Sequence, residues 1–260
     1  MKKSHFDKIG IKQVIRIEWM DRCLSLLLSG MTSEQIRIDL AHFLADKKQS
    51  GGIEDRGKKT YPIAISILAV WFDPAKELLQ FRNDLLDIAQ KIPQNEWLTL
   101  HWAIMIANYP FWYNVAIKAG RLLALQEKIT QKQVFDRIVE QYGQRSTVLR
   151  NARYTVRSFI AWGIMQDTDI KGKYCKSEPI PIADKDVIEA LIEAILISTP
   201  DHKALLETLL SSPALFPLCI ASDVAFSITA TNNEYLICEK LGDENMITAK
   251  RYWEFAGRKD

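Results

Sequence analysis

Residues 145–162 contain arginines spaced three and four residues apart, the spacing that places side chains on one face of a helix. Four arginines and no acidic residue occur between residues 145 and 162. In a helix, Arg150, Arg153 and Arg157 would lie about 140° to 200° around the axis from Val148, and so on one face. The planar fork of arginine donates paired hydrogen bonds to phosphate oxygens or to the O6 and N7 atoms of guanine. This helix face is therefore a candidate anion-binding surface.

The same helix has the features that would hold this face outward. An apolar stripe on its opposite side contains Val148, Ala152, Val156 and Phe159. Ser146 and Thr147 stand at its predicted N-terminus, where either hydroxyl is a candidate cap and where backbone amides attract a phosphate. A helix on an ordinary solvated surface carries acidic and basic residues at i, i+4, whereas this helix carries no acidic residue. A solubilising face, or a docking surface for an acidic protein, is the alternative interpretation.

The elements around this helix follow a recognisable order. Helices are predicted over residues 115–126 and 131–142, with Thr130 as a cap and Gly143 as a stop. After residues 146–162, extended segments at 164–165 and 174–182 enclose a charged loop. Two helices, a tight turn, a long helix and a hairpin resemble the winged-helix superfamily over residues 115–182. The resemblance implies that the long helix enters the major groove and that the hairpin flanks it as a wing.

This resemblance assigns the candidate nucleic-acid contacts. The long helix supplies Arg145, Ser146, Thr147, Arg150, Arg153 and Arg157. The wing supplies Lys171, Lys173, Tyr174 and Lys176, with Asp167 and Asp169 reducing its positive charge. We expect duplex DNA as the partner and the three helix arginines as the main contacts.

A second basic segment lies near the N-terminus. Residues 47–59 contain five basic and two acidic residues among three glycines. Arg56, Lys58 and Lys59 are candidate auxiliary phosphate contacts, since each neutralised phosphate steepens the salt dependence of binding. The alternative is a solvated loop, because charged loops need no partner.

The sequence contains no recognisable catalytic or metal-binding motif, so we expect a protein that is not an enzyme and that binds no cofactor and no metal. The chain has no GxxxxGK[ST], GxSxG or GxGxxG motif. Its cysteines form no CxxC pair and its histidines no HxxxH pair, which argues against zinc. His101, on an apolar helix, is interpreted as a buried structural histidine. Glu54 and Asp55 before Lys58 lack the strand context of a nuclease site.

The remaining sequence predicts a mainly α fold in three units. Residues 1–110 read as a helical N-terminal bundle, with helices over 11–28, from 32 or 33 to about 43, 62–72, 78–92 and 96–107 and an aromatic turn at 108–113. Residues 111–183 form the winged helix-turn-helix. Residues 184–260 read as a small α+β module that is itself winged-helix-like, with helices at 187–197, 202–210 and 213–224 and strands at 226–230 and 235–239.

The net charge of +2 conceals a strong asymmetry along the chain. Residues 184–247 hold eleven acidic and three basic residues, so the C-terminal module is acidic and the body before it is basic. We expect that module to bind a protein partner or a second copy, and not DNA. The layout is also similar to accessory proteins of bacterial phage-defence (BREX) operons, the BrxA family, which implies an antiviral role.

No secretory signal and no apolar stretch of about 20 residues is found, so a cytoplasmic protein without a membrane span is expected. The function predicted is a non-catalytic, DNA-binding accessory or regulatory factor. The alternative is a helical interaction adaptor within a larger complex, in which the arginine face meets protein.

Overall fold

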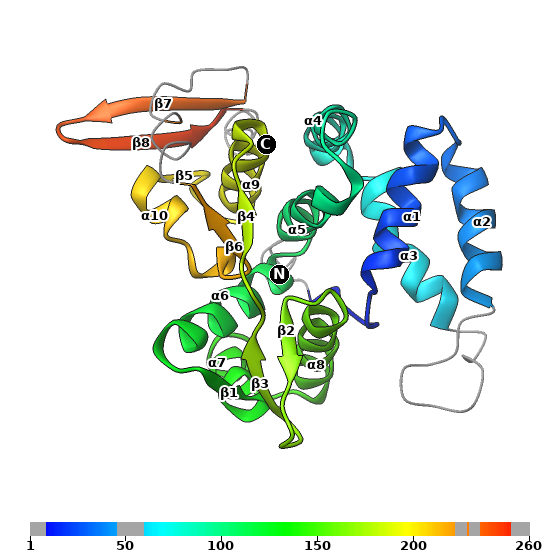
Figure 1. Cartoon of the computed structure of the whole chain (residues 1–260), viewed down its shortest axis with the longest axis horizontal. Helices are drawn as coiled ribbons and strands as arrows, with labels where there is room; N and C mark the ends of the chain where they lie inside the picture. Colours follow the sequence, from blue (N-terminus) through cyan, green and yellow to red (C-terminus); the bar gives the residue numbers. More distant parts are fainter. Residues whose placement is uncertain (1–8, 46–59, 222–227, 229–234, 251–260) are drawn as a thin grey trace, which may run out of the picture.

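The computed structural model describes residues 9–45, 60–221, 228 and 235–250. These residues form ten α-helices and three small sheets, a mainly α architecture with a small β part. In Figure 1 the N-terminal helices lie on one side, α5 runs through the middle, and two α+β groups lie below and beside it.

The N-terminal helices are α1 (Ile17–Leu28), α2 (Ser33–Ala45), α3 (Thr60–Phe72), α4 (Leu79–Ala89) and α5 (Trp97–Asn108). The helix predicted from residue 11 begins only at Ile17. Residues 9–16 instead run as a non-helical segment along a later helix, α8 (Ser146–Ala161). Ile11 and Ile15 are fully buried, and the Ile15 amide donates to Ser158 Oγ at 2.9 Å. Tertiary packing, and not local periodicity, thus determines this segment.

The middle group contains α6 (Pro110–Leu125), β1 (Lys128–Thr130), α7 (Gln131–Tyr142), α8, β2 (Met165–Asp167) and β3 (Lys173–Lys176). The three strands form an antiparallel sheet in the order β1-β3-β2. The predicted aromatic turn at 108–113 is shorter than expected, because α6 already begins at Pro110, a residue suited to a first helical turn. The short strand β1 was not predicted.

The C-terminal group contains α9 (Lys185–Ile197), β5 (Lys203–Leu205), α10 (Leu206–Leu210) and the hairpin of β7 (Leu236–Leu241) and β8 (Glu244–Ala249). Its sheet has the order β5-β8-β7. The predicted helix at 213–224 is wrong: residues 213–215 form a single 3₁₀ turn and residues 218–220 form strand β6. Pro217 lacks the amide that a continuing helix needs. Strand β6 pairs in parallel with β4 (Ile180–Ile182).

The two strands predicted for this group, at 226–230 and 235–239, are only partly correct. Strand β7 does begin within the second range, at Leu236, but its partner is β8 and the turn lies at Gly242, where φ is +64°. The other predicted strand, at 226–230, lies outside the described residues except for residue 228.

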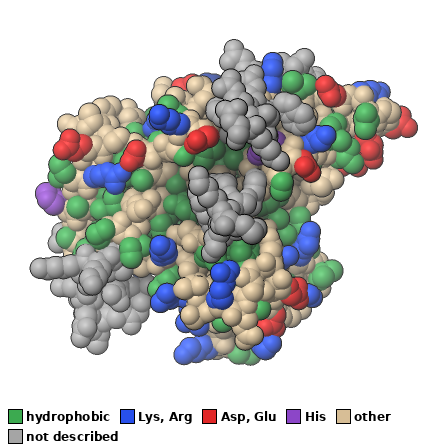
Figure 2. All heavy atoms as spheres, turned by 180° about the vertical axis from the view of Figure 1, so that it is seen from behind, with side chains coloured by type: hydrophobic (Ala, Val, Ile, Leu, Met, Phe, Trp, Pro, Cys, Tyr) green, Lys and Arg blue, Asp and Glu red, His purple; other side chains and the backbone are tan. Residues whose placement is uncertain are grey.

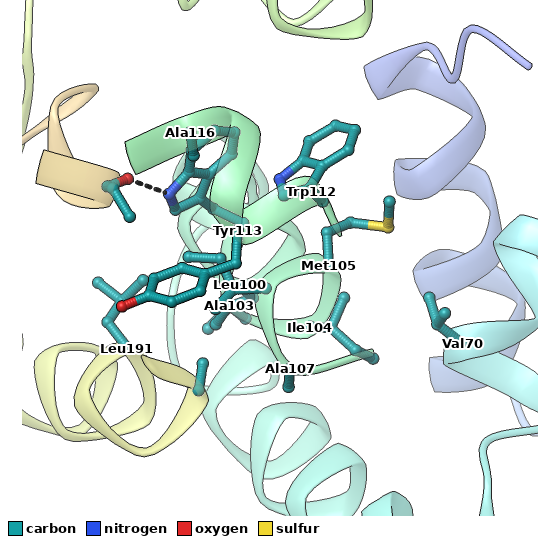
Figure 3. Close-up of a cluster of buried hydrophobic side chains, with 14 of the residues drawn as sticks. Val70, Leu100, Ala103, Ile104, Met105, Ala107, Trp112, Tyr113, Ala116 and Leu191 are labelled. Atoms are coloured by element: carbon teal, nitrogen blue, oxygen red, sulfur yellow. Dashed lines mark hydrogen bonds between the residues drawn. The ribbon is translucent and has the colours of Figure 1, made fainter. Parts of the chain in front are cut away.

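One continuous hydrophobic core joins all these groups. Helix α5 is at its centre, with residues 99–107 buried (Figure 3). Trp102 packs edge-on against Trp112, with the ring centroids 5.6 Å apart. Its Nε1 donates to the Ala214 carbonyl at 3.0 Å. Ser198 Oγ donates to the Ile106 carbonyl at 2.6 Å. The N-terminal, middle and C-terminal groups therefore stabilise one another through shared buried contacts.

Candidate nucleic-acid interface

Helix α8 is held by its apolar stripe. Val148, Ala152, Val156 and Phe159 are all fully buried, as the periodicity predicted. Phe159 packs against Trp112 with ring centroids 4.9 Å apart, and Gly143, at φ +79°, makes the turn from α7. The predicted cap is wrong: Arg145 occupies the N-cap position and makes no side-chain cap bond. Ser146 and Thr147 are instead the first helical residues, and both are exposed.

The opposite face of α8 is exposed. Arg150, Arg153 and Arg157 all lie on it, and we call these three residues the arginine face. Arg150 and Arg153 make no ion pair with any residue that the structure describes. Arg145 is also exposed and donates from Nη2 to the Tyr142 carbonyl at 2.8 Å, which fixes its guanidinium beside the start of α8. On the side shown in Figure 2, Lys and Arg side chains are scattered over the lower part of the molecule.

One member of the arginine face is already neutralised. Nη1 of Arg157 lies 2.7 Å from both carboxylate oxygens of Asp167, which is on β2. Both side chains are nearly half exposed, so water screens the pair. Arg157 therefore ties α8 to the hairpin and offers less free charge than Arg150 or Arg153.

The hairpin β2–β3 carries the predicted wing residues at different places. Lys171 is exposed in the turn before Gly172, whose φ of +78° suits glycine. Lys173 is half-buried at the start of β3. Lys176 lies at the other end of the strand, where it lines a pocket together with Gly120 of α6 and Cys219 of β6. The structure thus separates Lys176 from the turn that Lys171 and Lys173 flank.

Tyr174 requires a correction, because its side chain is buried and cannot serve as a surface contact. Its hydroxyl lies 3.1 Å from Gln131 Oε1, to which it donates. Burial raises the pKa of Tyr174 above its ordinary value, although the nearby charge of Arg157 opposes this. Alternation along β3 explains the difference, since Tyr174 points to the helices while Lys173 and Cys175 point away. Its role is to pack the sheet onto α7.

The auxiliary candidates Arg56, Lys58 and Lys59 lie outside the described residues. The structure instead adds a feature that the sequence did not predict: a cleft of about 980 Å³ between α3 and the N-terminal half of α8. We call it the α3–α8 cleft. Its described lining is Ile9, Gly10, Lys12, Pro62, Ile63, Ser66, Ile67, Tyr109, Arg145, Thr147, Arg150, Asn151 and Tyr154. Only tertiary packing brings these distant segments together, and no local pattern marks them.

His101 is a buried structural residue, as the sequence predicted. It is completely buried on α5, accepts a hydrogen bond at Nδ1 from Trp71 Nε1 at 3.1 Å, and lies 3.0 Å through Nε2 from Asp21 Oδ1. Burial lowers its pKa, with Asp21 opposing the shift. Both ring nitrogens are therefore engaged by side chains of the fold, one by Trp71 and the other by Asp21.

Among the described residues, no group of three or more His, Cys, Asp or Glu side chains is placed to hold a metal ion. Within the same part of the chain, no helix has the length and apolar character needed to cross a membrane.

Comparison with family models, with curated proteins and with solved structures finds no significant match to this chain.

Proposed function

We propose that residues 110–176 form a winged helix that binds duplex DNA without catalysing a reaction, with α8 as the recognition helix. The observation that carries this proposal is the exposed arginine face. Arg150 and Arg153 project from a helix whose other side is anchored in the core, and no described carboxylate pairs with them. A basic face on an anchored helix is a characteristic electrostatic footprint of a DNA-binding module.

The order of elements supports the proposal. Helix α6, strand β1, helices α7 and α8, and the hairpin β2–β3 follow one another, and β1 pairs with β3 to close the small sheet. This is the sequence of elements expected of a winged helix. The turn at Gly143 separates α8 from α7, and Arg150 and Arg153 on the outer face of α8 are exposed.

The residues have chemically distinct tasks in this proposal. Arg150 and Arg153 contact phosphates or base edges in the major groove, where arginine forks bind guanine. Ser146 and Thr147 place hydroxyls and backbone amides at the positive end of the α8 dipole, where a phosphate is favoured. Lys171, at the hairpin turn, contacts the phosphate backbone of the DNA next to the groove that α8 enters. Arg157 contributes least, because Asp167 competes for it.

Duplex binding measured by fluorescence anisotropy across a salt series tests the proposal. We expect Arg150→Ala and Arg153→Ala each to weaken binding by about tenfold or more and to make the salt slope shallower by about one unit. The matched control is Arg137→Ala, since Arg137 is an exposed arginine of α7 already paired with Glu140 at 3.1 Å. Weak duplex binding that is indifferent to both α8 substitutions would reject the proposal.

A protein-interaction adaptor is the second candidate, and the Arg157–Asp167 pair is the observation that favours it. The pair demonstrates that this face accepts a carboxylate in good geometry. An acidic protein segment bound at Arg150 and Arg153 would then replace DNA. The acidic C-terminal group remains the predicted site for a protein partner or a second copy, and a role in phage defence remains a prediction.

A further inference from the structure

Three basic residues line the α3–α8 cleft, and only one of them, Arg150, also belongs to the arginine face. Lys12 comes from the N-terminal segment, while Arg145 and Arg150 come from the start of α8. No acidic residue is among its described lining. Thr147, at the beginning of a 16-residue helix, adds a hydroxyl where the helix dipole is positive. Three cations and a helix N-terminus lining one cleft suit a phosphate group.

A buried polar side chain lines the same cleft. Asn151 is 5% exposed, and its Nδ2 donates to the Thr147 carbonyl at 2.7 Å. Its Oδ1 has no hydrogen-bond partner in the part of the chain that the structure describes. A buried carbonyl oxygen without a donor is unfavourable, so a ligand that supplies an N–H group gains affinity there. Nδ2 is already fixed by Thr147 and Oδ1 has almost no accessible surface, so a ligand engages this acceptor only when the cleft wall shifts slightly on binding.

The remaining walls are apolar or aromatic. Ile63 and Ile67 face the cleft from α3, and Tyr109 and Tyr154 add aromatic rings. Gly10 is required at this wall, because a Cβ there would lie 2.6 Å from the Tyr109 ring. A flat heterocycle fits such a surface, since most ligand pockets combine apolar walls with a few placed polar groups. The volume of about 980 Å³ falls in the range typical of small-molecule sites.

We infer that the α3–α8 cleft binds a nucleotide unit whose base carries an exocyclic amine, with adenine as the best fit. The phosphate lies against Lys12, Arg145 and Arg150, the base lies between the apolar walls, and its amine donates to Asn151 Oδ1. In nucleic-acid complexes the side-chain oxygen of asparagine accepts from the exocyclic amine of adenine as one half of a paired contact, and this is the half that Asn151 would supply. The ligand is either a free nucleotide or the terminal nucleotide of a strand.

This inference does not depend on duplex binding, but the two sites share Arg150. A nucleotide in the cleft takes up a guanidinium that the arginine face would otherwise offer to the duplex. We therefore expect a bound nucleotide to weaken duplex affinity modestly, and Arg150→Ala to affect both ligands. Substitutions of Arg145 and Asn151 test nucleotide binding in the cleft separately from duplex binding, because these residues line the cleft without belonging to the arginine face.

Calorimetric titration of the full chain with AMP and with IMP tests the inference. IMP has the same size but a carbonyl in place of the exocyclic amine, so we expect it to bind about tenfold more weakly than AMP. Lys12→Ala and Arg145→Ala should each weaken AMP by about tenfold. Asn151→Leu should abolish the difference between AMP and IMP, while Arg137→Ala, outside the cleft, should leave both affinities unchanged.

The two sources of the ligand are separated with a single-stranded oligonucleotide that begins in 5′-phosphoadenosine. Tighter binding of this oligonucleotide than of AMP, again sensitive to Asn151→Leu, assigns the cleft to a strand end. Failure of the oligonucleotide to displace AMP assigns it to a free nucleotide. Both results support the inference.

The inference is overturned if neither AMP nor the oligonucleotide binds, or if wild-type protein binds AMP and IMP equally. It is also overturned if Lys12→Ala and Arg145→Ala leave AMP affinity unchanged. These wild-type and cation comparisons remain decisive even if Asn151→Leu fails to fold, which thermal unfolding would reveal. Loss of duplex binding with intact AMP binding would reject the proposed function alone, so the two failures are distinguishable.

Discussion

Arg157 of α8 and Asp167 of β2 are joined by a salt bridge in which Nη1 lies 2.7 Å from both carboxylate oxygens. The bridge connects the proposed recognition helix to the first strand of the hairpin. It also means that the strongest sequence signal, three arginines on one face, consists of one neutralised guanidinium group and two that have no ion pair among the described residues. The distribution of positive charge on α8 is therefore set by the hairpin as well as by the helix.

Asp167→Asn should increase duplex affinity, because it releases Arg157 to contact a phosphate. We expect a gain of about threefold to tenfold and a salt slope steeper by about one unit. The effect on folding should be below about 1 kcal/mol, since an exposed ion pair contributes little. Duplex titrations at several salt concentrations measure both quantities.

The control for this substitution is Asp73→Asn, which breaks the Arg37–Asp73 pair of the N-terminal helices, far along the chain from α8. It removes the same negative charge without releasing an arginine of α8. Equal gains from the two substitutions would indicate a general charge effect and contradict the specific role of the Arg157–Asp167 pair.

Acidification should destabilise the protein through His101. The buried ring has a pKa below its ordinary value of 6.5, and protonated Nδ1 would oppose the N–H of Trp71. As pH falls through 6.5, the unfolded chain takes up a proton at His101 before the folded chain does. The free energy of unfolding should then fall, by up to about 1.4 kcal/mol per pH unit, until the lower folded-state pKa is reached.

Urea unfolding at about pH 7.5 and about pH 5.5 measures this dependence, an interval that brackets the ordinary histidine pKa. His101→Gln, which keeps a donor and an acceptor but does not titrate, should make the unfolding free energy less dependent on pH. His42→Gln changes an exposed histidine of α2 and should leave the dependence as in the wild type. A pH dependence that survives His101→Gln would mean that other groups cause it.

Thr130→Ala should destabilise α7 by about 1 kcal/mol, since the hydroxyl is a helix cap. The Gln133 amide donates to Thr130 Oγ1 at 3.1 Å, and Gln133 Oε1 accepts from the Thr130 amide at 2.7 Å, which completes a capping box. Thermal or urea unfolding measures the loss. Thr168→Ala, in the hairpin turn, removes a hydroxyl without removing a helix cap, and an equal loss from it would refute the capping argument.

Local signals explain which parts of the fold could be predicted. Helix α7 was predicted over its full length, because Thr130 and Gly143 mark its ends. Helix α8 was predicted to within one residue at its end, although its N-cap was misassigned. By contrast, β5 was missed, within the helix predicted over 202–210, because its pairing with β8 joins residues far apart, as in the register of Lys203 with Thr248. Strand pairing at such separations leaves no periodic trace in one segment.

The features of the candidate site also divide into those that local sequence predicts and those that depend on tertiary packing. The exposure of Arg150 and Arg153 follows from helical geometry alone, so the sequence predicted it. The burial of Tyr174 depends on which side of β3 meets α7. The α3–α8 cleft depends on residues 9–12, which pack on α8 in a non-helical conformation that the apolar periodicity of residues 11–28 did not predict. Features that need two distant segments were thus outside the reach of the sequence.

Gly120→Ala should disrupt the junction between α6 and the C-terminal group. A Cβ at this position would lie 1.9 Å from the Pro213 carbonyl oxygen and 2.8 Å from its carbon, and backbone atoms cannot move aside as a side chain can. Alanine favours a helix over glycine by about 1 kcal/mol, but overpacking of a tight core costs about 1–3 kcal/mol or more. The clash should therefore outweigh the gain in helix propensity.

The measurement for Gly120→Ala is the free energy of unfolding, combined with the intrinsic tryptophan fluorescence of the chain, to which Trp102 contributes; Trp102 Nε1 donates to the neighbouring Ala214 carbonyl. We expect a net destabilisation and a change in tryptophan emission, because the loop that carries both carbonyls must shift. Ala124→Ser, one turn later on α6 at an exposed position, provides the control for altering this helix. Stabilisation by Gly120→Ala would mean that α6 and residues 213–215 are not in close contact in solution.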